Sequence, residues 1–135
     1  MALIRAEPLL AGRACGPLLR LARPLSFWGG VDPATGAIVD RDSDGYGRAV
    51  GGTVLALAAT RGSSSSSAVL LELAHRGLAP AALLLAEPDA ILLVGAIVAR
   101  EMGWPAPPVL RLAPTDQARL AQGVTVDIAE DGGLA

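Results

Sequence analysis

The chain consists of apolar runs separated by short polar turns, and the length of these runs differs between its two parts. Residues 1–50 carry glycine and proline at short intervals, and the apolar pieces at 3–4, 9–10, 18–19 and 38–39 are typical of short β-strands joined by tight turns. From Thr53 onward, longer apolar segments alternate between strand and helix patterns. We therefore expect an α/β fold in which a β-rich N-terminal layer packs on an α/β half, as one domain spanning residues 1–135.

The second part predicts alternating strands and helices. Strands are expected at 53–59, 81–86, 108–112 and 124–129, and helices at 65–76, 88–102 and 115–122. Pro88 fits the first position of its helix, and Thr115 fits the N-cap of the last one. Three consecutive βα units imply parallel strands covered by helices, in the order βαβαβαβ.

Five consecutive serines, Ser63 to Ser67, join an apolar strand to an apolar helix. A flexible serine linker has polar or glycine-rich flanks, so this run is better explained as a strand-to-helix turn with Ser63 or Ser64 as N-cap. The helix that follows ends at Gly77, which fits a C′ glycine. Free N–H groups and the positive end of the helix dipole make such a turn a seat for a carboxylate or phosphate. Alternatively, one serine caps the helix and the others have no function.

Composition narrows the class of protein. An apolar content of 52% with 18% charged residues indicates a folded globular chain, and a net charge of −2 gives no electrostatic footprint for nucleic acid. All 11 basic residues are arginine, which excludes a Schiff-base or P-loop lysine in this chain. The apolar segment at 81–99 is interrupted at 87–89, so no single run reaches the roughly 18 uninterrupted apolar residues of a membrane span. We therefore expect a soluble, cytoplasmic protein without membrane contact.

The side chains that commonly bind metals are scarce. One cysteine, Cys15, and one histidine, His75, are too few for a metal or iron–sulfur site within this chain, so we expect no bound metal. Cys15 is predicted to be a small buried side chain, and His75 a surface residue at a helix end.

A second dense patch surrounds Trp28-Gly29-Gly30, where the glycine pair permits close approach of the backbone. Two interpretations stay open for this patch. It forms either a turn with an aromatic plug over the end of a barrel, or the wall of a cleft that faces the serine turn.

These patches together carry a resemblance to a known family. The segments PLSFWGGVD at 24–32, TRGSSSSS at 60–67 and APAA at 79–82 resemble the small subunit of aconitase X, the swivel-domain half of a two-part hydro-lyase. The resemblance covers nearly the whole chain and implies a swivelling β/β/α fold. Members of this family dehydrate cis-3-hydroxy-L-proline or phosphomevalonate. The large subunit holds an iron–sulfur or iron centre, and the small one carries a serine that acts as base.

By this motif the base is Ser63, the first residue after Gly62. Ordinary aconitases have an arginine two positions after that serine, where this chain has Ser65, and Arg61 is the nearest arginine. The resemblance thus implies a dehydratase subunit that works only with its large subunit, converting cis-3-hydroxy-L-proline to Δ1-pyrroline-2-carboxylate. The substrate would be bound by Arg61, Gly62, Ser64, Ser65, Trp28, Gly29 and Gly30.

Two alternatives remain beside this function. The first is the small subunit of a phosphomevalonate dehydratase. The second is a non-catalytic swivel module that binds an anion at the turn, or carries phosphate on His75.

Overall fold

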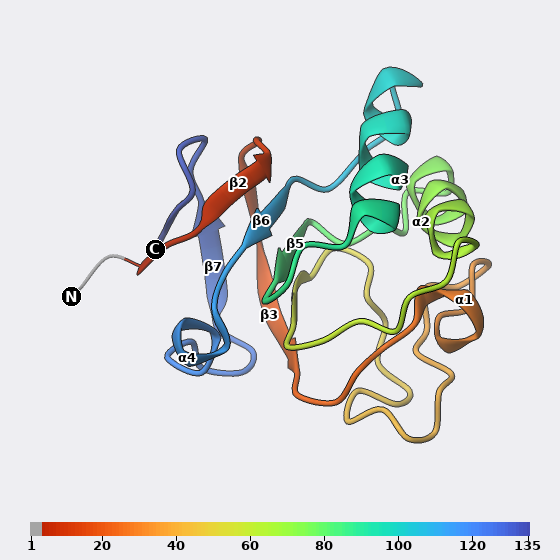
Figure 1. The fold of residues 1–135 in the computed structure, drawn as a ribbon, viewed down its shortest axis with the longest axis horizontal. Coiled ribbons are helices and arrows are strands. Elements are labelled where there is room, and N and C mark those ends of the chain that lie inside the picture. Colours follow the sequence, from red (N-terminus) through yellow and green to blue (C-terminus); the bar gives the residue numbers. More distant parts are fainter. Residues whose placement is uncertain (1–3) are drawn as a thin grey trace.

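Four parallel strands with apolar side chains on both faces form the centre of the molecule, which a computed structural model describes for residues 4–135 (Figure 1). The described strands are β1 (Ile4–Arg5), β2 (Glu7–Leu10), β3 (Ala14–Leu21), β4 (Val54–Leu57), β5 (Ala82–Leu85), β6 (Val109–Arg111), β7 (Thr125–Ile128) and β8 (Gly133–Leu134). The described helices are α1 (Phe27–Gly30), α2 (Ser66–His75), α3 (Ala90–Glu101) and α4 (Pro114–Gln117).

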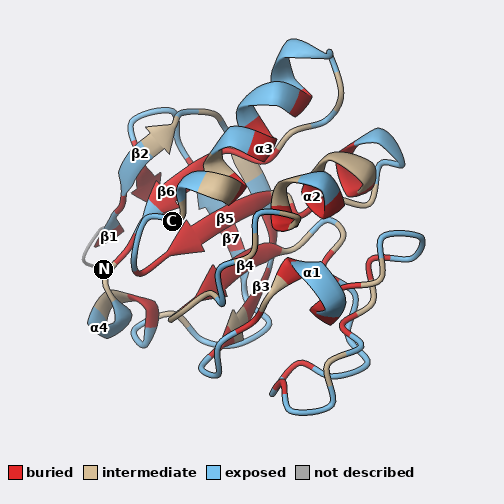
Figure 2. Ribbon diagram, turned by 45° about the vertical axis from the view of Figure 1, so that its right-hand side comes forward, coloured by how far each residue is buried: buried red, intermediate tan, exposed pale blue. Residues whose placement is uncertain are grey.

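The register of the parallel strands aligns apolar residues in rows. Leu19 pairs with Leu55, Leu55 with Leu83, and Leu83 with Val109, and all four are buried in the cluster between the sheet and the helices. The residues one position earlier on three of these strands belong to a second cluster on the opposite face: Leu18, Val54 and Ala82. Because both of their faces are buried, the two central strands β4 and β5 are apolar throughout rather than alternating with polar residues (Figure 2).

The segment from Ile4 to Leu10 closes the sheet. Its first residues pair with β8, Ile4 opposite Leu134, and its last ones pair with β6, Pro8 opposite Leu110. The strand order β1-β8-β7-β3-β4-β5-β6-β2 therefore begins and ends on one continuous stretch of chain. The sheet curls into a barrel whose interior holds the second apolar cluster.

Helices α2 and α3 cover one side of the barrel and pack against each other at Gly95. A Cβ at that position would lie 3.1 Å from the Cα of Ser67, so only glycine lets the two helices approach this closely. One face of α2 is apolar and buried, and it is formed by Val69, Leu70, Leu73 and Ala74. Gly77 has a φ of +72° directly after the C-cap, which confirms its predicted role.

The mixed α/β class is confirmed, but two details of the arrangement differ from the prediction. After β6 the chain passes under the barrel and enters beside β3, held there by the hydrogen bonds of Leu18 with Gly123 and Val124. The strand β7 is therefore antiparallel to β3 instead of completing a parallel βαβαβαβ series. The N-terminal strands form no separate layer, because β3 lies in the middle of the same sheet.

Several local predictions were wrong. The helix α3 begins after the N-cap Asp89, so Pro88 lies outside it, and α4 begins at Pro114 rather than after a Thr115 cap. Residues 38–39 form no strand, since Ile38 makes only an isolated bridge with Val31, and residue 3 lies outside the described residues.

Cys15 is exposed, because it lies on the part of β3 that pairs with β7 and points to the outer side of the barrel. The prediction of a buried cysteine was therefore wrong. Its hydrogen bond to the Asp127 side chain raises the pKa of the thiol, and partial desolvation and the Asp127 charge act in the same direction.

Gln117 closes the barrel at the end where the parallel strands finish. Its side chain is 2% exposed, and Nε2 lies 3.1 Å from the carbonyl oxygen of Leu57, 3.0 Å from that of Leu112 and 3.4 Å from that of Leu84. One amide group thus connects the ends of β4, β5 and β6.

We predict that Gln117→Leu lowers the free energy of unfolding by about 1–3 kcal/mol, because a buried carbonyl loses its donor. Gln122→Leu is the matched control. Gln122 also bonds to backbone, accepting from the Arg20 N–H and donating to the Arg20 carbonyl, but at an exposed position where water can replace it. Its loss should cost less than about 1 kcal/mol. Urea unfolding of both variants measures the difference, and equal losses would contradict the assigned role.

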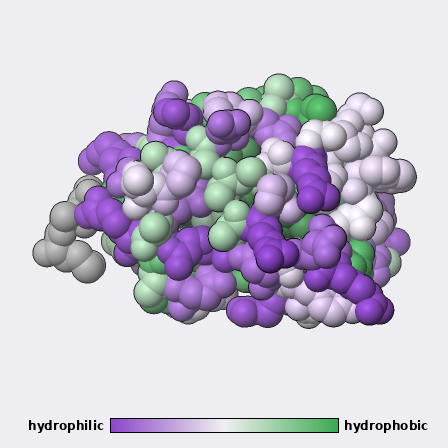
Figure 3. Space-filling model, turned by 60° about the horizontal axis from the view of Figure 1, so that its bottom comes forward, coloured by the Kyte–Doolittle hydropathy of each residue, from purple (hydrophilic) through white to green (hydrophobic). Residues whose placement is uncertain are grey.

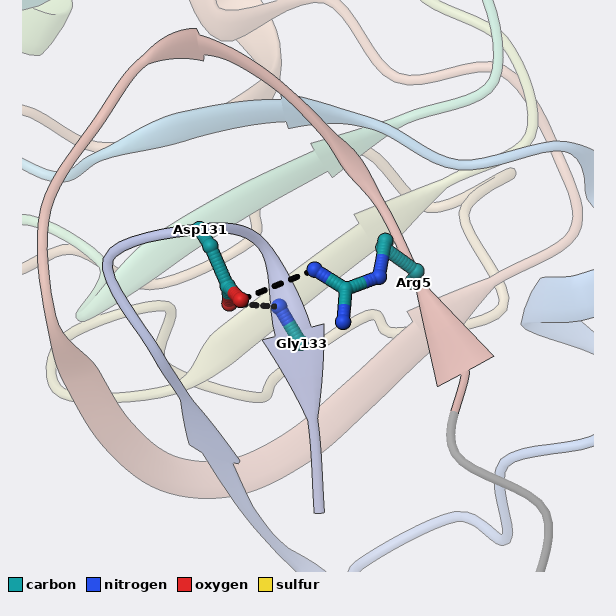
Figure 4. Close-up of polar contacts among 3 residues, drawn as sticks. All are labelled: Arg5, Asp131 and Gly133. Carbon is teal, nitrogen blue, oxygen red and sulfur yellow. Dashed lines mark hydrogen bonds and ion pairs between the residues drawn. The ribbon is translucent and has the colours of Figure 1, made fainter.

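An ion pair between Arg5 and Asp131 connects the N-terminal segment that closes the sheet to the turn before β8 (Figure 4). Arg5 Nη1 donates to Asp131 Oδ2 at 2.8 Å, and the Gly133 N–H donates to Asp131 Oδ1 at 3.0 Å. These contacts, the guanidinium first, lower the pKa of Asp131.

A lowered pKa in the folded state means that Asp131 stabilises the fold above its unfolded-state pKa of roughly 4, and that this stability is lost as the pH falls through the lower folded-state value. We predict that Asp131→Asn makes the acid side of the stability profile less steep and leaves the profile between pH 6 and 8 parallel to that of the wild type. Thermal unfolding between about pH 2 and 8 tests this, and unchanged acid dependence would contradict it.

Candidate functional site

The turns that leave the parallel strands meet at one end of the barrel. The chain passes from β4 to the serine run and α2, and from β5 to the start of α3. Residues at this end are mostly hydrophilic, with small hydrophobic areas between them (Figure 3). In open α/β sheets, ligands bind at the carboxyl ends of the strands, so this end is where a site is expected.

The serine run forms a tight turn around the hydroxyl of Ser63. The Ser65 N–H donates to Ser63 Oγ at 3.3 Å, and the Ser66 N–H donates to the Ser63 carbonyl at 3.0 Å. Among residues 4–135, the N–H groups of Gly62, Ser63 and Ser64 find no acceptor. The turn therefore presents free backbone donors beside a serine hydroxyl at the positive end of α2.

The helix cap differs from the prediction. The N-cap is Ser65, whose side chain makes no capping hydrogen bond, rather than Ser63 or Ser64. Ser63 instead accepts a bond from within the turn that precedes the helix. The backbone of Ser65 is already helical, with φ −82° and ψ −8°. The serine side chain that accepts a backbone hydrogen bond is therefore that of Ser63, two residues before the N-cap.

The other serines have different surroundings. Ser66 is 3% exposed, and its Oγ lies 3.4 Å from the backbone N–H of Trp28, which donates to it. Ser67 Oγ donates to the Ser64 carbonyl at 3.3 Å. Ser64 is exposed. The run is therefore a set of distinct positions rather than a uniform tract.

The two motifs found in the sequence run side by side. Leu25 forms a parallel bridge with Thr60, and the Arg61 N–H donates to the Leu25 carbonyl at 3.1 Å. With the Trp28–Ser66 contact, these bonds hold residues 25–28 along residues 59–66. The structure thus brings together the Trp28 patch and the serine turn.

The sequence left open whether the Trp28 patch is an aromatic plug or the wall of a cleft. In the structure, its two aromatic residues differ in this respect. Phe27 is buried in the apolar cluster and acts as a plug, whereas Trp28 is 58% exposed. Trp28 and Gly29 line a mostly apolar cavity of about 450 Å³ together with Val31, Asp32, Pro33, Val39 and Val69. Ser63 and Arg61 are not among its lining residues.

The two glycines of this patch differ. Gly29 has a φ of +80° and open space where a Cβ would lie, so it requires glycine for its backbone conformation. Gly30 is buried, and its Cβ would lie 3.2 Å from Leu25 Cδ1. A side chain at position 30 would therefore press on the core and not only on a ligand.

Arg61 is exposed, and among residues 4–135 its guanidinium makes no hydrogen bond or ion pair. Gly62 is exposed too, with nothing within 4 Å of an added Cβ. His75 lies at the other end of α2, exposed, with its ring 4.7 Å from that of Trp104.

Sequence reasoning missed one contact at this site. Thr60 Oγ1 donates to Asp89 Oδ2 at 2.8 Å, and Asp89 is the N-cap of α3. An aspartate just before an apolar helical segment is a capping signal, which our placement of Pro88 inside the helix overlooked.

Metal ligands do not gather in the described part of the chain. No three histidine, cysteine or acidic side chains within residues 4–135 lie close enough to hold a metal ion. None of the helices there has the length and hydropathy of a membrane span.

Comparison with known proteins covers almost the whole chain. A family model of the aconitase X swivel domain matches residues 3–135. A cis-3-hydroxy-L-proline dehydratase of Pseudomonas aeruginosa is 47% identical over 128 residues, which are 90% of this chain but 22% of that protein. A phosphomevalonate dehydratase small subunit of Thermococcus onnurineus is 36% identical over 131 residues, covering 97% of this chain and 95% of the relative.

A solved structure agrees with these matches. The crystal structure of Thermococcus kodakaraensis aconitase X in its holo-form superposes with a TM-score of 0.87 at 29% identity, covering 99% of this chain and 97% of that one. The fold thus agrees with the sequence match, and the chain belongs to the aconitase X swivel-domain family.

Proposed function

We propose that this chain is the small subunit of an aconitase X-type hydro-lyase, with Ser63 as the catalytic base, and that its substrate is a 3-hydroxy acid, cis-3-hydroxy-L-proline. The chain spans about a fifth of the hydroxyproline dehydratases it matches, 22% and 18% of their lengths. We propose that the large subunit corresponds to the remainder of those proteins.

The observation that carries this proposal is the donor geometry around Ser63. A serine is a weak base in water because its alkoxide is unstable there. In the turn, the Ser65 N–H already donates to Ser63 Oγ, and this bond strengthens when the oxygen is charged. The helix start adds positive potential, and preorganised donors of this kind stabilise a developing oxyanion.

The proposed steps balance as a dehydration. Ser63 acts as its alkoxide: Oγ takes the proton from the carbon next to the carboxylate and becomes a neutral hydroxyl. The bond from the neighbouring carbon to its hydroxyl breaks with both electrons as a carbon–carbon double bond forms, so hydroxide departs. The proton that Ser63 removed is then returned through solvent to this hydroxide, which gives one water and restores the alkoxide. With 3-hydroxyproline the resulting enamine tautomerises to Δ1-pyrroline-2-carboxylate.

Substrate contacts are assigned to the same end of the barrel. Arg61 is proposed to hold the carboxylate, with the backbone of Gly62, Ser64 and Ser65 as further donors, because a guanidinium can form two parallel bonds to a carboxylate. Trp28, Gly29 and Gly30 are proposed to cover the apolar side of the substrate. Trp28 and Gly29 line an apolar cavity next to α2, which suits a contact with carbon atoms rather than with charge.

The iron–sulfur or iron centre is assigned to the large subunit. The donors of this chain do not fit such a group, since its single cysteine is exposed and stands alone. The name "small subunit" of the archaeal relatives implies a large partner. Exposed apolar side chains on α3 (Val94, Ile97 and Val98) and at its C-cap (Met102) support a partner chain, because isolated domains rarely expose such groups together.

Identity and length favour different substrates. The hydroxyproline dehydratase of Pseudomonas aeruginosa is the more similar of the two relatives at 47% against 36%, but the separate small subunits act in phosphomevalonate dehydratases. Phosphomevalonate dehydration is therefore our second candidate. A phosphocarrier role for His75 is less favoured, because the negative end of the α2 dipole opposes a phosphoryl group there.

We predict that the purified chain alone turns over neither substrate, and that activity appears when the matching large subunit is added. Dehydration of cis-3-hydroxy-L-proline and of phosphomevalonate would be measured with each subunit and with the mixture. The preferred substrate decides between the two candidates. Turnover by the isolated chain would contradict the two-subunit proposal.

We predict that Ser63→Ala lowers kcat of the complex by at least about 10²–10⁴-fold, the usual contribution of a positioned proton-transfer group. Ser67→Ala is the control, because the Ser67 hydroxyl, in the first turn of α2, donates to the Ser64 carbonyl and makes no other hydrogen bond within residues 4–135. Subunit association should be unchanged in both variants. Wild-type activity of Ser63→Ala would remove Ser63 from the mechanism.

A further inference from the structure

The contact between Thr60 and Asp89 joins the start of the serine turn to a neighbouring helix. Thr60 stands three residues before Ser63, and its Oγ1 lies 2.8 Å from Asp89 Oδ2 at a partly buried position. The other oxygen of Asp89 is fully engaged, accepting from the N–H groups of Ile91 at 3.0 Å and Leu92 at 3.1 Å. The carboxylate therefore caps α3 with one oxygen and holds Thr60 with the other.

The backbone on both sides of Thr60 is held as well. The Leu25 N–H donates to the Ala59 carbonyl at 3.4 Å, and the Arg61 N–H donates to the Leu25 carbonyl at 3.1 Å. Beyond Arg61, the next fixed point is the start of α2, which Gly95 holds against α3. Ser63 thus lies in a short segment between two restrained points, and the first of these is at Thr60.

We propose that Thr60 is a positioning residue, which sets the place of Ser63 through its hydrogen bond to Asp89. This inference rests on the proposed role of Ser63 as base. A hydroxyl that donates to a carboxylate makes a stronger and shorter bond than one between neutral groups, so it restrains the chain effectively. Asp89 keeps its cap on α3 when Thr60 is changed, so the effect falls on the turn.

Proton transfer is sensitive to such a restraint, because a displacement of roughly 1 Å can cost about 10²-fold in rate. Thr60→Val keeps the shape of the side chain and removes only the donor. We expect this variant to lower kcat of the two-subunit enzyme by about 10- to 100-fold, with little change in KM. Thr60→Ser, which keeps the hydroxyl, should restore most of kcat.

The chain supplies a matched control at the other end of the same strand. Thr53, just before β4, is also partly buried, and its Oγ1 donates to the Val50 carbonyl at 2.7 Å. Thr53→Val removes a hydroxyl of the same kind away from the serine turn, and kcat should remain within about twofold of wild type. Amide hydrogen exchange is the second readout: Thr60→Val should accelerate exchange at Ser65 and Ser66, whereas Thr53→Val should not.

The outcomes separate this inference from the proposed function. If Ser63→Ala is inactive but Thr60→Val has wild-type kcat, the inference is overturned and the base assignment stands. If Ser63→Ala is fully active, the base assignment fails, and with it the role of Thr60 in catalysis. Equal losses of kcat in Thr60→Val and Thr60→Ser, or unchanged exchange at Ser65 and Ser66, also overturn the inference.

Discussion

Burial of both faces of the four central strands is the constraint on which the rest of this molecule depends. A shift of one residue in register would exchange the helix-facing row with the row inside the barrel, so that leucines would have to fit where the small side chains of Ala56 and Ala82 now lie. The register therefore holds the ends of β4, β5 and β6 together at one edge. Every turn that matters for the candidate site starts from that edge.

Polar groups at that edge serve mainly to satisfy the backbone. Gln117 donates to carbonyls at the strand ends, Asp89 accepts from the first turn of α3, and Asp44 accepts from the N–H groups of Ala22 and Arg23 after β3. At this edge, the N–H groups of Gly62, Ser63 and Ser64 in the serine turn have no acceptor within residues 4–135. Free backbone donors held on a rigid frame are the arrangement that favours binding of an anionic substrate.

The turn itself takes its shape from distant contacts rather than from its own serines. Leu25 fixes its start through the backbone, Trp28 contacts Ser66, and Asp89 holds Thr60. The glycine at position 95 lets α3 approach α2 closely at Ser67, directly after this turn. The identical residues of the serine run therefore have different surroundings: the Ser63 hydroxyl lies in the turn, and Ser66 is buried.

The sequence alone determined the elements that depend on local patterns. The continuous apolar runs of β4 and β5, the inward face of α2, the glycine after it and the placement of the serines between strand and helix all follow from residues within a few positions of one another. The motif also named Ser63 and Arg61, whose roles remain predictions. Only the tertiary structure decided what depends on pairing between remote segments. Such pairing places β7 antiparallel beside β3, exposes Cys15, buries Phe27 in place of Trp28 and brings Thr60 to Asp89. Local periodicity records which residues are apolar, but which strand each of them pairs with depends on how the whole barrel closes.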